Sequence, residues 1–596
     1  MENRDVARLL RETAHLLEID GAIIGRYRSY ERAAELIDAL PERIESLVAD
    51  PERLTALPGI GDRMAEHLQE IVKTGQYSLR TKLLKKYPST ILDLLNLQSL
   101  GPKKVALLWK TFKAGTVEQV EALAREGKLR DLPGFGEKSE QNILKAVEVY
   151  KRSSGRFLLD VAQRQADELT SHIRGLGKKV ADVQAAGSLR RSKETVGDLD
   201  LLVTLPEGHS AAHDVEAVSD HVLKFPGIHQ VLARGENKVS FVLESGMQVD
   251  VRLLPPSQAG AALLYFTGSK EHNVSLRSRA LKMGYTLNEY ALSRLKDEKP
   301  VAGRTEEEIY KKLGLAWIPP ELRENSGEIE AAEKGRLPNL VTRQEIRGDL
   351  QMHTTASDGK NSILEMARAA KALGHEYIAI TDHSKAVTVA NGLDEKRMRA
   401  HIQAIRAAQT EIEGIRLLVS CEVDILKDGS LDLAEDVLAQ LDVVLCSIHS
   451  YMNLDRAAMT ERMVAALENP YVQIIAHPTG RLLLRRDGFE YDMERILTLA
   501  RERGVAMECN SYPDRLDLRD THLRMAKDRG VKIVISTDAH STANLSLIEY
   551  GVRTARRGWL EPADVLNTLP CDKLLAALRP KPGAATRPSA RARKRR

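Results

Sequence analysis

The stretch Gly187-Ser188-Leu189-Arg190-Arg191 and its continuation Gly197-Asp198-Leu199-Asp200-Leu201-Leu202-Val203 decide how the chain is organised. Asp198 and Asp200 lie two positions apart at the start of an apolar run, which predicts a strand with both carboxylates on one face. A second alternating run, over residues 247–254, carries Asp250 and predicts a neighbouring strand. Three carboxylates repel one another unless cations lie between them, so the pattern indicates a Mg²⁺ or Mn²⁺ site for phosphoryl transfer. The alternative for an isolated Asp-x-Asp pair is a solvated turn.

Two arginines directly precede these carboxylates. Arg190 and Arg191 suit a triphosphate, because guanidinium groups bind phosphate oxygens in a forked geometry. Together with the glycines and the three aspartates, these residues resemble the nucleotidyltransferase palm of family X DNA polymerases. The resemblance covers the chain from residue 1 to about residue 318. It implies that Asp198, Asp200 and Asp250 are catalytic, hold two metal ions and place Asp250 beside the primer 3′-hydroxyl.

The resemblance also implies contacts to the incoming nucleotide and to DNA. The motif Tyr265-Phe266-Thr267-Gly268-Ser269 is similar to the family's motif beneath the nucleotide sugar, where the aromatic pair disfavours a 2′-hydroxyl. The implied nucleotide-binding residues are Gly187, Ser188, Arg190, Arg191, Gly197, Tyr265, Phe266, Gly268 and Asn273. Arg252 and Arg277 are implied DNA contacts of the same region.

Composition limits the class of protein. A chain of 596 residues is too long for one hydrophobic core, so several domains are expected. The net charge of +4 means that a nucleic-acid surface must be a local patch. The four cysteines form no Cys-x-x-Cys pair, which argues against a disulfide framework and a thiolate zinc site. The sequence has no signal-like apolar start and no apolar run of membrane length, so we expect a cytoplasmic, nucleoid-associated protein without membrane partners.

A short glycine unit recurs three times in the N-terminal part of the chain. Its copies are Leu57-Pro58-Gly59-Ile60-Gly61-Asp62-Arg63, Leu100-Gly101-Pro102-Lys103-Lys104 and Leu132-Pro133-Gly134-Phe135-Gly136-Glu137-Lys138. A glycine turn before a helix exposes backbone N–H groups that bind a phosphate oxygen without reading sequence. A single copy could be an ordinary tight turn, but the repetition favours helix-hairpin-helix elements, which the copies resemble. The resemblance implies DNA contacts at Gly59, Gly61, Arg63, Gly101, Lys103, Gly134, Gly136 and Lys138.

The first unit lies in a region that resembles the family's small 5′-phosphate-binding domain. The resemblance implies cationic and stacking contacts from Arg26, Tyr30, Arg32 and Arg63. In relatives with lyase activity, a lysine of this helix forms a Schiff base with an abasic sugar, and the matching position here is His67. Imidazole forms no stable Schiff base, so we expect 5′-phosphate binding without efficient lyase chemistry.

Beyond residue 348 the chain alternates short β-branched apolar runs with helical stretches, a rhythm typical of a parallel α/β barrel. Nearly every run ends at a metal-ligand residue, such as Asp382-His383 after residues 377–381 and Asp538-Ala539-His540 after residues 531–537. The carboxyl ends of barrel strands meet at one face, so these side chains are expected to converge. A single histidine would more often be a core residue, but the repeated placement favours a metal cluster.

This series resembles the PHP phosphoesterase domain, which bacterial family X enzymes carry after the polymerase. The implied metal ligands are His353, Asp358, His383, Glu422, His449, His477, Asp538 and His540. Mixed imidazole and carboxylate ligands suit a cluster of roughly two to three Mn²⁺, Zn²⁺ or Fe²⁺ ions that would support hydrolysis from a DNA 3′ end. Gln351 stands where the family has the first histidine of His-x-His, so one ion is expected to bind loosely. Arg515 is a candidate contact to the substrate phosphate and hence to DNA.

These observations predict a multidomain fold class: helical helix-hairpin-helix N-terminal domains, an α+β nucleotidyltransferase palm and a distorted, TIM-like α/β PHP barrel. The expected domains are a small 5′-phosphate-binding domain (1–85), a helical DNA-binding subdomain (86–152), the palm with a nucleotide-binding subdomain (153–318), a linker that is not fully disordered (319–345), the PHP domain (346–576) and a basic, disordered tail (577–596).

The predicted function is template-dependent gap filling in DNA repair, combined with a metal-dependent 3′–5′ exonuclease in the PHP domain. The expected partners are gapped or primer-template DNA and deoxynucleoside triphosphates (dNTPs), bound by a monomer. Two alternatives remain for the PHP domain. It could be a small-molecule phosphomonoesterase, or a non-catalytic scaffold because Gln351 weakens the metal site.

Overall fold

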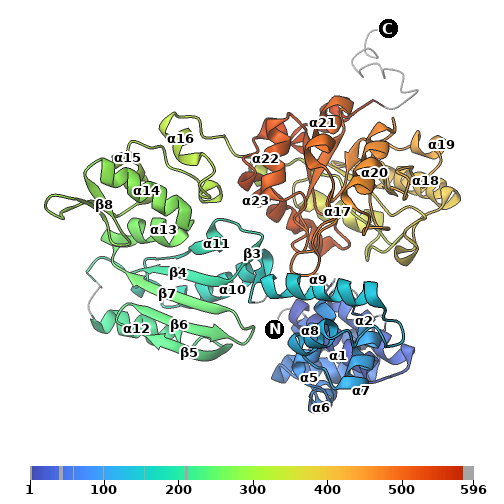
Figure 1. Ribbon diagram of the computed structural model, residues 1–596, viewed down its shortest axis with the longest axis horizontal. Helices are drawn as coiled ribbons and strands as arrows, with labels where there is room; N and C mark the ends of the chain where they lie inside the picture. The colour runs from blue at the N-terminus through green and yellow to red at the C-terminus, as the bar shows by residue number, and fades with distance from the viewer. Residues whose placement is uncertain are drawn as a thin grey trace, which may run out of the picture. The chain divides into compact units, whose positions relative to one another are not determined.

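Among the described residues, only helices build the part of the chain before residue 155, whereas strands and helices alternate beyond it (Figure 1). The computed structural model describes residues 3–38, 40, 44–57, 59–97, 100–153, 155–208 and 212–580. The chain divides into two units, residues 1–154 with the short segments 484–487 and 541–543, and the remainder. The expected tail, residues 577–596, lies outside the described residues from position 581 onward. No helix in the described ranges has both the length and the apolar character needed to cross a membrane.

The helices before residue 155 each bury one apolar face, as amphipathic helices do. They are α1 (Asn3–Ile19), α2 (Ile24–Asp38), α3 (Ile44–Val48), α4 (Pro51–Thr55), α5 (Asp62–Thr74), α6 (Ser78–Lys86), η1 (Ser89–Asn96), α7 (Pro102–Phe112), α8 (Val117–Arg125) and α9 (Glu137–Ser153). Leu10 of α1, Leu68 of α5 and Val105 of α7 are fully buried in one core. Thr116 begins α8 with a capping box, in which its hydroxyl accepts from the Gln119 N–H. The three glycine units directly precede α5, α7 and α9, as the sequence predicted.

The palm contains a five-stranded sheet in the order β2-β4-β7-β6-β5. Its strands are β2 (Asp182–Ala185), β4 (Asp198–Thr204), β5 (Ile228–Arg234), β6 (Lys238–Leu243) and β7 (Gln248–Leu254). The strands predicted around the aspartates are confirmed, and β4 and β7 pair in parallel. The other palm elements are β1 (Phe157–Leu158), α10 (Leu159–Arg174), η2 (Gly177–Lys179), α11 (Gly187–Arg190), β3 (Thr195–Val196) and α12 (Ala212–Val222). Leu169 of α10 and Val218 of α12 join Val249 of β7 in the palm core.

A second subdomain, the thumb, follows the palm. Its elements are η3 (Pro256–Gln258), α13 (Ala259–Thr267), α14 (Lys270–Lys282), β8 (Tyr285–Leu287), β9 (Leu292–Arg294), β10 (Pro300–Ala302), α15 (Glu306–Lys312), η4 (Pro320–Leu322), α16 (Glu328–Glu333) and η5 (Arg343–Glu345). The segment 319–345, expected to be a linker, packs onto the thumb. Its Arg323 is fully buried and donates to Glu306 at 2.6 and 3.0 Å. Charged residues that suggested a linker therefore form buried ion pairs.

The C-terminal domain is a seven-stranded parallel sheet in the order β11 to β17, which confirms the predicted α/β arrangement. Its strands are β11 (Gly348–Asp349), β12 (Tyr377–Ile380), β13 (Arg416–Asp424), β14 (Val443–Ser447), β15 (Ile474–Ile475), β16 (Ala506–Asn510) and β17 (Ile533–Ser536). The two outer strands approach each other beyond their carboxyl ends, where Met352 forms a parallel bridge with Ala539. The sheet thus closes into a barrel at the end where the predicted metal ligands lie.

Helices follow the barrel strands and cover them. They are α17 (Ile363–Ala372), η6 (Thr388–Ala390), α18 (Glu395–Glu411), α19 (Glu435–Leu438), α20 (Arg456–Glu468), α21 (Met493–Arg503), α22 (Asp520–Asp528), η7 (Thr542–Leu547), α23 (Ile548–Arg557), η8 (Pro562–Asp564), η9 (Leu566–Thr568) and α24 (Cys571–Ala577). The barrel also contributes to the cores of the polymerase subdomains. Leu516 is fully buried in the palm core, and Trp559 packs in the thumb core. Palm, thumb and barrel therefore share apolar packing.

Candidate active sites

The three palm aspartates lie on two paired strands. In β4, Asp198 and Asp200 flank the fully buried Leu199, so both carboxylates lie on the face opposite to it. Asp250 of β7 is directly opposite Asp200 in the parallel register. Asp198 is exposed, and Asp200 and Asp250 are half-buried. The structure therefore brings the three predicted ligands together at a site that a substrate can reach.

The three carboxylates differ in proton affinity. Burial, followed by repulsion from Asp198 and Asp250, raises the pKa of Asp200 to about 6. Burial also acts to raise the pKa of Asp250, but its 2.6 Å ion pair with Lys238 holds that pKa below the ordinary value. Among the described residues, Oδ1 of Asp250 has no hydrogen-bond partner. Crowded negative charge and an unsatisfied buried oxygen fit a divalent cation.

A pocket of about 690 Å³ opens beside Asp198 and Asp200. It is lined by the predicted nucleotide and DNA contacts Gly187, Ser188, Arg191, Gly197, Tyr265, Phe266, Gly268, Asn273 and Arg277. Gly187 has φ +61°, and a Cβ there would lie 2.7 Å from the Asp200 carboxylate. Only glycine lets the backbone pass so close to this ligand. The volume lies within the range of small-molecule sites.

The two adjacent arginines of the opening motif have different environments. Arg191 lines the pocket, and its Nε donates to Glu324 at 3.0 Å. Arg190 donates to Glu306 at 2.7 and 2.9 Å and to Thr267 at 2.8 Å. It lines a separate cavity of about 260 Å³. The structure does not bring Arg190 into the larger pocket, because consecutive residues of a helix point in different directions.

Arg252 and Lys238 support the pocket from neighbouring strands. The guanidinium carbon of Arg252 lies 4.0 Å from the centre of the Phe266 ring, a cation–π contact beneath a pocket residue. Arg252 does not line the pocket itself. Lys238 of β6 was missed by sequence reasoning. Its strand pairs with β7 so that Ser240 is opposite Asp250. Lys238 lies two residues before Ser240 on the same face, so knowledge of this register would have indicated its contact with Asp250.

The glycine units leave their backbone open before each helix. Gly59 and Gly134 have φ +82° and +79°, a region that favours glycine. A Cβ added at Gly59, Gly61, Gly101, Gly134 or Gly136 would meet nothing within 4 Å. The middle and third units lie together, because Lys104 Nζ is 3.2 Å from the Ser139 hydroxyl and 5.0 Å from the Phe135 ring centre. These turns can therefore be approached by a phosphate.

Four of the predicted cations near these turns are exposed: Arg26, Arg63, Lys103 and Lys138. Tyr30 behaves differently. It is 5% exposed, its hydroxyl lies 3.1 Å from Nδ1 of His67, and the two rings stack. The expected stacking contact of Tyr30 is therefore wrong, because its ring is part of the domain core. His67 is also buried, and burial lowers its pKa.

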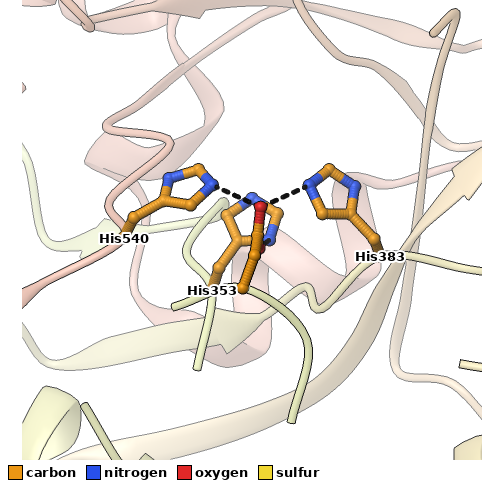
Figure 2. A group of neighbouring side chains, drawn as sticks. His353, His383 and His540 are labelled. Atoms are coloured by element: carbon orange, nitrogen blue, oxygen red, sulfur yellow. Dashed lines mark ion pairs between the residues drawn. The ribbon is translucent and has the colours of Figure 1, made fainter. Parts of the chain in front are cut away.

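The barrel gathers the predicted metal ligands at the carboxyl ends of its strands. Three groups each offer donor atoms within 4.8 Å of one another: His353, Asp358, His383 and His540; His383, Glu422 and His449; and His353, Glu422 and Asp538. Figure 2 shows the imidazoles of His353, His383 and His540 around one carboxylate oxygen. Shared residues join the three groups into one cluster. His477 belongs to it through Glu422, whose Oε1 lies 2.8 Å from Nε2 of His477.

The chemistry of this cluster fits divalent cations. Among the described residues, Nδ1 of His353, Nδ1 of His383 and Oε2 of Glu422 are buried without a hydrogen-bond partner. Burial lowers the pKa of His383 to about 4, so its imidazole is neutral and can donate a lone pair. Burial also disfavours protonation of His353, but the surrounding carboxylates raise its pKa to about 10. A cation at His353 would therefore displace a proton.

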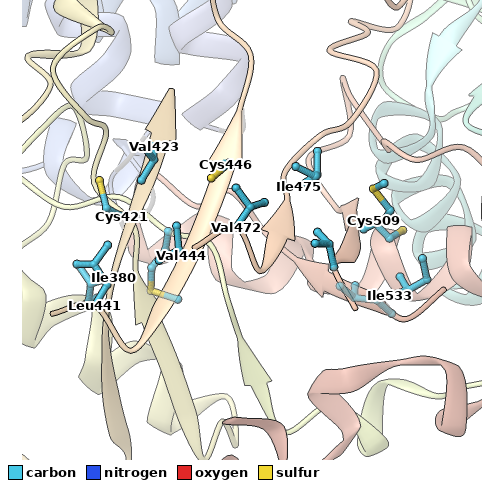
Figure 3. Packing of buried hydrophobic residues seen from close by; sticks show 14 of the residues in the cluster. Ile380, Cys421, Val423, Leu441, Val444, Cys446, Val472, Ile475, Cys509 and Ile533 are labelled. Atoms are coloured by element: carbon cyan, nitrogen blue, oxygen red, sulfur yellow. The ribbon is translucent and has the colours of Figure 1, made fainter. Parts of the chain in front are cut away.

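Core residues and cluster residues alternate along β13. Cys421 and Val423 belong to the apolar layer between the strands and the surrounding helices (Figure 3), and Glu422 and Asp424 face the other way. Asp424 Oδ1 lies 3.1 Å from Nδ1 of His449 and orients this ligand. Sequence reasoning missed Asp424, although it lies two positions from Glu422, the same spacing that identified Asp198 and Asp200 in the palm.

A further buried pair orients the cluster. Asp382 lies 2.8 Å from Nε2 of His401 and accepts hydrogen bonds from Thr354 and Ser357. Thr354 directly follows the ligand His353 in the chain, so these bonds fix the start of the segment that carries Asp358. His401 lies within α18, and its sequence context gave no signal for this role.

Gln351 lies two residues after the end of β11, beside the cluster. It is fully buried, its side-chain oxygen lies 3.5 Å from the Asn510 amide, and its own amide nitrogen has no partner among the described residues. Asn510 also donates to Asp538 at 3.2 Å and to Glu508 at 3.3 Å. Burial raises the pKa of Glu508 well above its ordinary value. Glu508 and Asn510 were missed, although both lie near the carboxyl end of β16, where the strand-end rule applies.

Arg515 lies beside the cluster. Its Nε is 3.5 Å from Oδ2 of Asp538, a member of the cluster. Burial alone would lower the pKa of Arg515, but the nearby carboxylates of Asp538 and Asp514 favour the charged guanidinium and raise the pKa above its ordinary value. The cluster of imidazoles and carboxylates thus has a guanidinium group beside it, and guanidinium groups can bind phosphate oxygens in a forked geometry.

Models of known domain families match the chain in the order of its domains. A helix-hairpin-helix domain matches residues 1–77, and a SAM-like helix-hairpin-helix tandem matches residues 91–148. The DNA polymerase beta palm matches residues 161–238, and the DNA polymerase beta thumb matches residues 262–324. The PHP domain matches residues 349–512.

Similar proteins divide into relatives of nearly the whole chain and relatives of about a third of it. Two proteins named as probable phosphatases match about a third of this chain. One, from Thermoanaerobacter sp. (strain X514), is 29% identical over 37% of this chain and 89% of its own length. The other, from Acetivibrio thermocellus, is 33% identical over 32% of this chain and 78% of its own length.

A relative of the whole chain is named DNA polymerase/3′-5′ exonuclease PolX, from Bacillus subtilis (strain 168). It is 38% identical over 569 residues, which are 95% of this chain and 97% of the relative. The match spans the helical domains, the palm, the thumb and the barrel. The chain therefore belongs to the family X DNA polymerases that carry a C-terminal PHP domain.

Proposed function

We propose that the chain is a template-dependent DNA polymerase that fills gaps in DNA repair and also removes nucleotides from 3′ ends. The observation that carries the polymerase activity is the register of β4 and β7, which sets Asp200 opposite Asp250 beside the pocket that Arg191 lines. Carboxylates beside a phosphate-binding arginine suit nucleotidyl transfer. The Bacillus subtilis relative carries both activities in its name.

In the palm, the chain's own residues position the primer and the nucleotide. Asp198, Asp200 and Asp250 would hold Mg²⁺ or Mn²⁺, which would activate the primer 3′-hydroxyl and stabilise the leaving pyrophosphate. Arg191 offers forked donors to the triphosphate. The Lys238 ammonium, 2.6 Å from Asp250, keeps that carboxylate ionised beside the primer end.

The aromatic pair of the pocket supports selection of deoxynucleotides. Tyr265 and Phe266 line the pocket, and their ring centres lie 5.1 Å apart in an edge-on arrangement. Asn273 donates to the Tyr265 carbonyl at 2.7 Å, which fixes the end of α13 against α14. A fixed aromatic wall beneath the sugar leaves little room for a 2′-hydroxyl.

In the barrel, the histidine and carboxylate cluster supports hydrolysis of a phosphodiester. Bound Mn²⁺, Zn²⁺ or Fe²⁺ would supply a nucleophile and neutralise the phosphate. Arg515 would bind a non-bridging phosphate oxygen beside Asp538. Asp424 keeps His449 oriented through a 3.1 Å contact.

The helical domains support recognition of DNA by its backbone. The open turns at Gly59 and Gly134 would bind phosphates through N–H groups, which selects for gapped or primer-template structure rather than sequence. The exposed cations of these domains would add salt-dependent affinity. His67, buried against Tyr30, supports phosphate binding without efficient lyase chemistry. We expect a monomer to carry out these steps.

A second candidate activity of the barrel is hydrolysis of a small-molecule phosphomonoester. The observation that favours it is the similarity of about a third of this chain to proteins named as probable phosphatases. The same cluster of imidazoles and carboxylates serves either substrate class, so only the substrate distinguishes them.

A 5′-labelled primer with a 3′ mismatch tests the two active sites separately. The Asp198→Ala/Asp200→Ala protein is incubated with this primer in Mn²⁺ without nucleotides, and His383→Ala serves as the comparison. We expect the first protein to shorten the primer and the second to leave it intact. Gap filling is expected to be lost only in the palm variant.

The other results would redirect the assignment. If neither variant nor the parent protein shortens the primer while all bind metal and DNA, the exonuclease assignment fails. Turnover of a phosphomonoester without cleavage of DNA would then assign a small-molecule phosphatase. Hydrolysis of neither ester would leave the barrel as a scaffold.

A further inference from the structure

Two arginines of the barrel hold the palm loop that leads from Arg191 to the catalytic strand β4. Arg557, the last residue of α23, donates through Nη1 to the backbone carbonyl of Arg191 at 2.7 Å. Arg481 donates through Nη2 to the Glu194 carboxylate at 2.8 Å. Both arginines are at most 8% exposed. Guanidinium groups buried this deeply require fixed partners, so these contacts define the geometry of the loop.

Arg557 is fixed within the barrel before it reaches the palm. Its Nη2 donates to Asp520, the first residue of α22, at 2.5 Å. A cation at the carboxyl end of α23 and an anion at the amino end of α22 also match the two helix dipoles. Asp520 therefore sets the direction of the Arg557 guanidinium, and the palm loop adapts to it.

Glu324 connects Arg557 to the side chain of Arg191. Its Oε1 accepts from Arg557 Nη1 at 3.0 Å and from Arg191 Nε at 3.0 Å. Burial alone would raise the pKa of Glu324, but Arg557 and then Arg191 hold it below the usual value. Arg191 Nη1 also donates to the carbonyl of Thr267, at the end of the helix that carries Tyr265 and Phe266. The guanidinium that lines the nucleotide pocket thus has its plane fixed by Glu324 and Thr267.

We infer that Arg557 of the PHP barrel is a positioning residue of the polymerase site, acting through Glu324 and the Arg191 backbone to orient Arg191 toward the triphosphate. The inference rests on the proposed polymerase function and adds a role for the barrel that needs no metal in the barrel. Arg557 does not contact the nucleotide. Its removal would leave Arg191 bonded to Thr267 and to a Glu324 carboxylate that has lost its second cation, so the guanidinium is held less firmly, which weakens binding of the triphosphate.

The test compares Arg557→Ala with Arg556→Ala in the full chain. Arg556 is the preceding residue of α23 and pairs with Glu321 at 2.6 Å, so it crosses the same interface without contacting the loop or Glu324. We expect Arg557→Ala to raise the KM for dNTP about tenfold, the range of a lost charge-assisted hydrogen bond. Arg556→Ala is expected to change this KM less than about twofold, which is typical of a peripheral contact.

A double-mutant cycle separates positioning from general destabilisation. If Arg557 acts through Arg191, the Arg191→Ala/Arg557→Ala protein has the same KM for dNTP as Arg191→Ala alone. Affinity for primer-template DNA and the rate of 3′-end removal are expected to stay within about twofold in Arg557→Ala, because neither depends on Arg191. If the increases in KM for dNTP of the two single variants multiply in the double variant, the inference is wrong.

Two conservative variants keep the test open if Arg557→Ala fails to fold. Arg557→Lys retains the charge between Asp520 and Glu324 but lacks the fork, so an intermediate KM is expected. Glu324→Gln retains the shape but loses the shared anion, and is expected to raise the KM as Arg557→Ala does. If the KM for dNTP is unchanged in Arg557→Lys and Glu324→Gln while the parent protein fills gaps normally, the inference about Arg557 is refuted and the polymerase assignment stands. Absence of gap filling in the parent protein refutes the polymerase assignment instead.

Discussion

Asp200 and Asp250 are chemically identical side chains opposite each other on paired strands, yet their surroundings give them different proton affinities. Burial and two neighbouring carboxylates raise the pKa of Asp200 to about 6, whereas Lys238 lowers that of Asp250. The difference arises from positions that the strand register fixes, rather than from residue type. Two predictions belong to this scale, one for each metal-binding region.

Asp200→Asn is expected to stabilise the protein in the absence of metal at neutral pH. Asp200 keeps its proton in the folded state up to a pKa of about 6, whereas in the unfolded chain it loses the proton at its ordinary pKa of 3.8. Stability therefore falls as the pH rises between these values, and the full penalty, about 3 kcal/mol, applies above them. In EDTA, Asp200→Asn should melt at a higher temperature than the parent protein at about pH 7.5, but not at about pH 3.5.

The exposed Asp198 provides the matched comparison. Asp198→Asn removes one charge of the same cluster without relieving the burial of Asp200, so a smaller gain is expected. Added Mg²⁺ should raise the melting temperature of the parent protein more than that of Asp200→Asn. An Asp200→Asn protein that melts below the parent in EDTA at neutral pH would contradict the assigned electrostatics.

Gln351→His is expected to tighten the weakest metal position in the barrel. Gln351 is buried next to Asn510 and Asp538, so an imidazole there would add a ligand to the group of His353, Glu422 and Asp538. We expect about tenfold tighter binding of the added ion, because imidazole is a better ligand than an amide. Metal content measured by mass spectrometry and the rate of primer shortening should both rise. Gln351→Asn is the control, and equal metal content in both variants would contradict the expectation.

At the scale of elements, short turns and strand ends determine which groups reach a substrate. The helix-hairpin-helix turns depend on a glycine with positive φ at Gly59 and Gly134. The barrel ligands depend on strands that end together, so that a parallel sheet collects side chains distant in sequence. In both the glycine turns and the strand ends, backbone geometry determines which groups are exposed to a substrate. The glycine turns allow a direct test.

Gly59→Ala is expected to weaken binding of gapped DNA more than Gly61→Ala. Both glycines face open space, but Gly59 has φ +82° and Gly61 has φ −88°. An alanine at Gly59 would add about 1–2 kcal/mol of backbone strain, or would move the N–H groups that bind phosphate. Titration of labelled gapped DNA measures the effect. Equal losses for the two variants would show that the turn conformation is not the determinant.

The elements that the sequence predicted are those with strong periodicity. The run around Asp250 alternates and forms β7, and the apolar run that begins at Asp198 forms β4. The apolar runs before His383 and Asp538 form β12 and β17. Side-chain directions were less predictable. Arg190 turned toward Glu306 because α11 is a single helical turn whose orientation depends on the thumb. Tyr30 is buried by packing against His67, which no local pattern encodes.

At the scale of the whole molecule, the palm, the thumb and the barrel are joined by packing that the separate motifs do not reveal. Leu516 of the barrel is buried in the palm core, and Trp559 is buried in the thumb core. The segment 319–345 is held by the buried pair of Arg323 and Glu306. The roles of these residues were not predicted, because no local sequence pattern marks them and their partners are distant in the chain.

Metal binding to the barrel is expected to protect the palm against unfolding. If the shared cores make the two parts unfold together, Mn²⁺ at about 100 times its dissociation constant should slow global exchange of palm amides about hundredfold. The Asp198→Ala/Asp200→Ala protein excludes binding in the palm itself. Hydrogen exchange of β6 and β7 reports the effect. Protection confined to barrel strands would show that the parts unfold separately.

The contact of Arg557 with the palm loop has a consequence for inheritance and for the exchange of modules between relatives. A lesion in α23 would be scored in a genetic screen as a polymerase defect, although it maps to the phosphoesterase domain. A hybrid gene that joins this palm to a foreign barrel would need compatible residues at positions 191, 194 and 324 to match those at 481, 520 and 557. The two enzymes of this chain would therefore be expected to evolve as one unit.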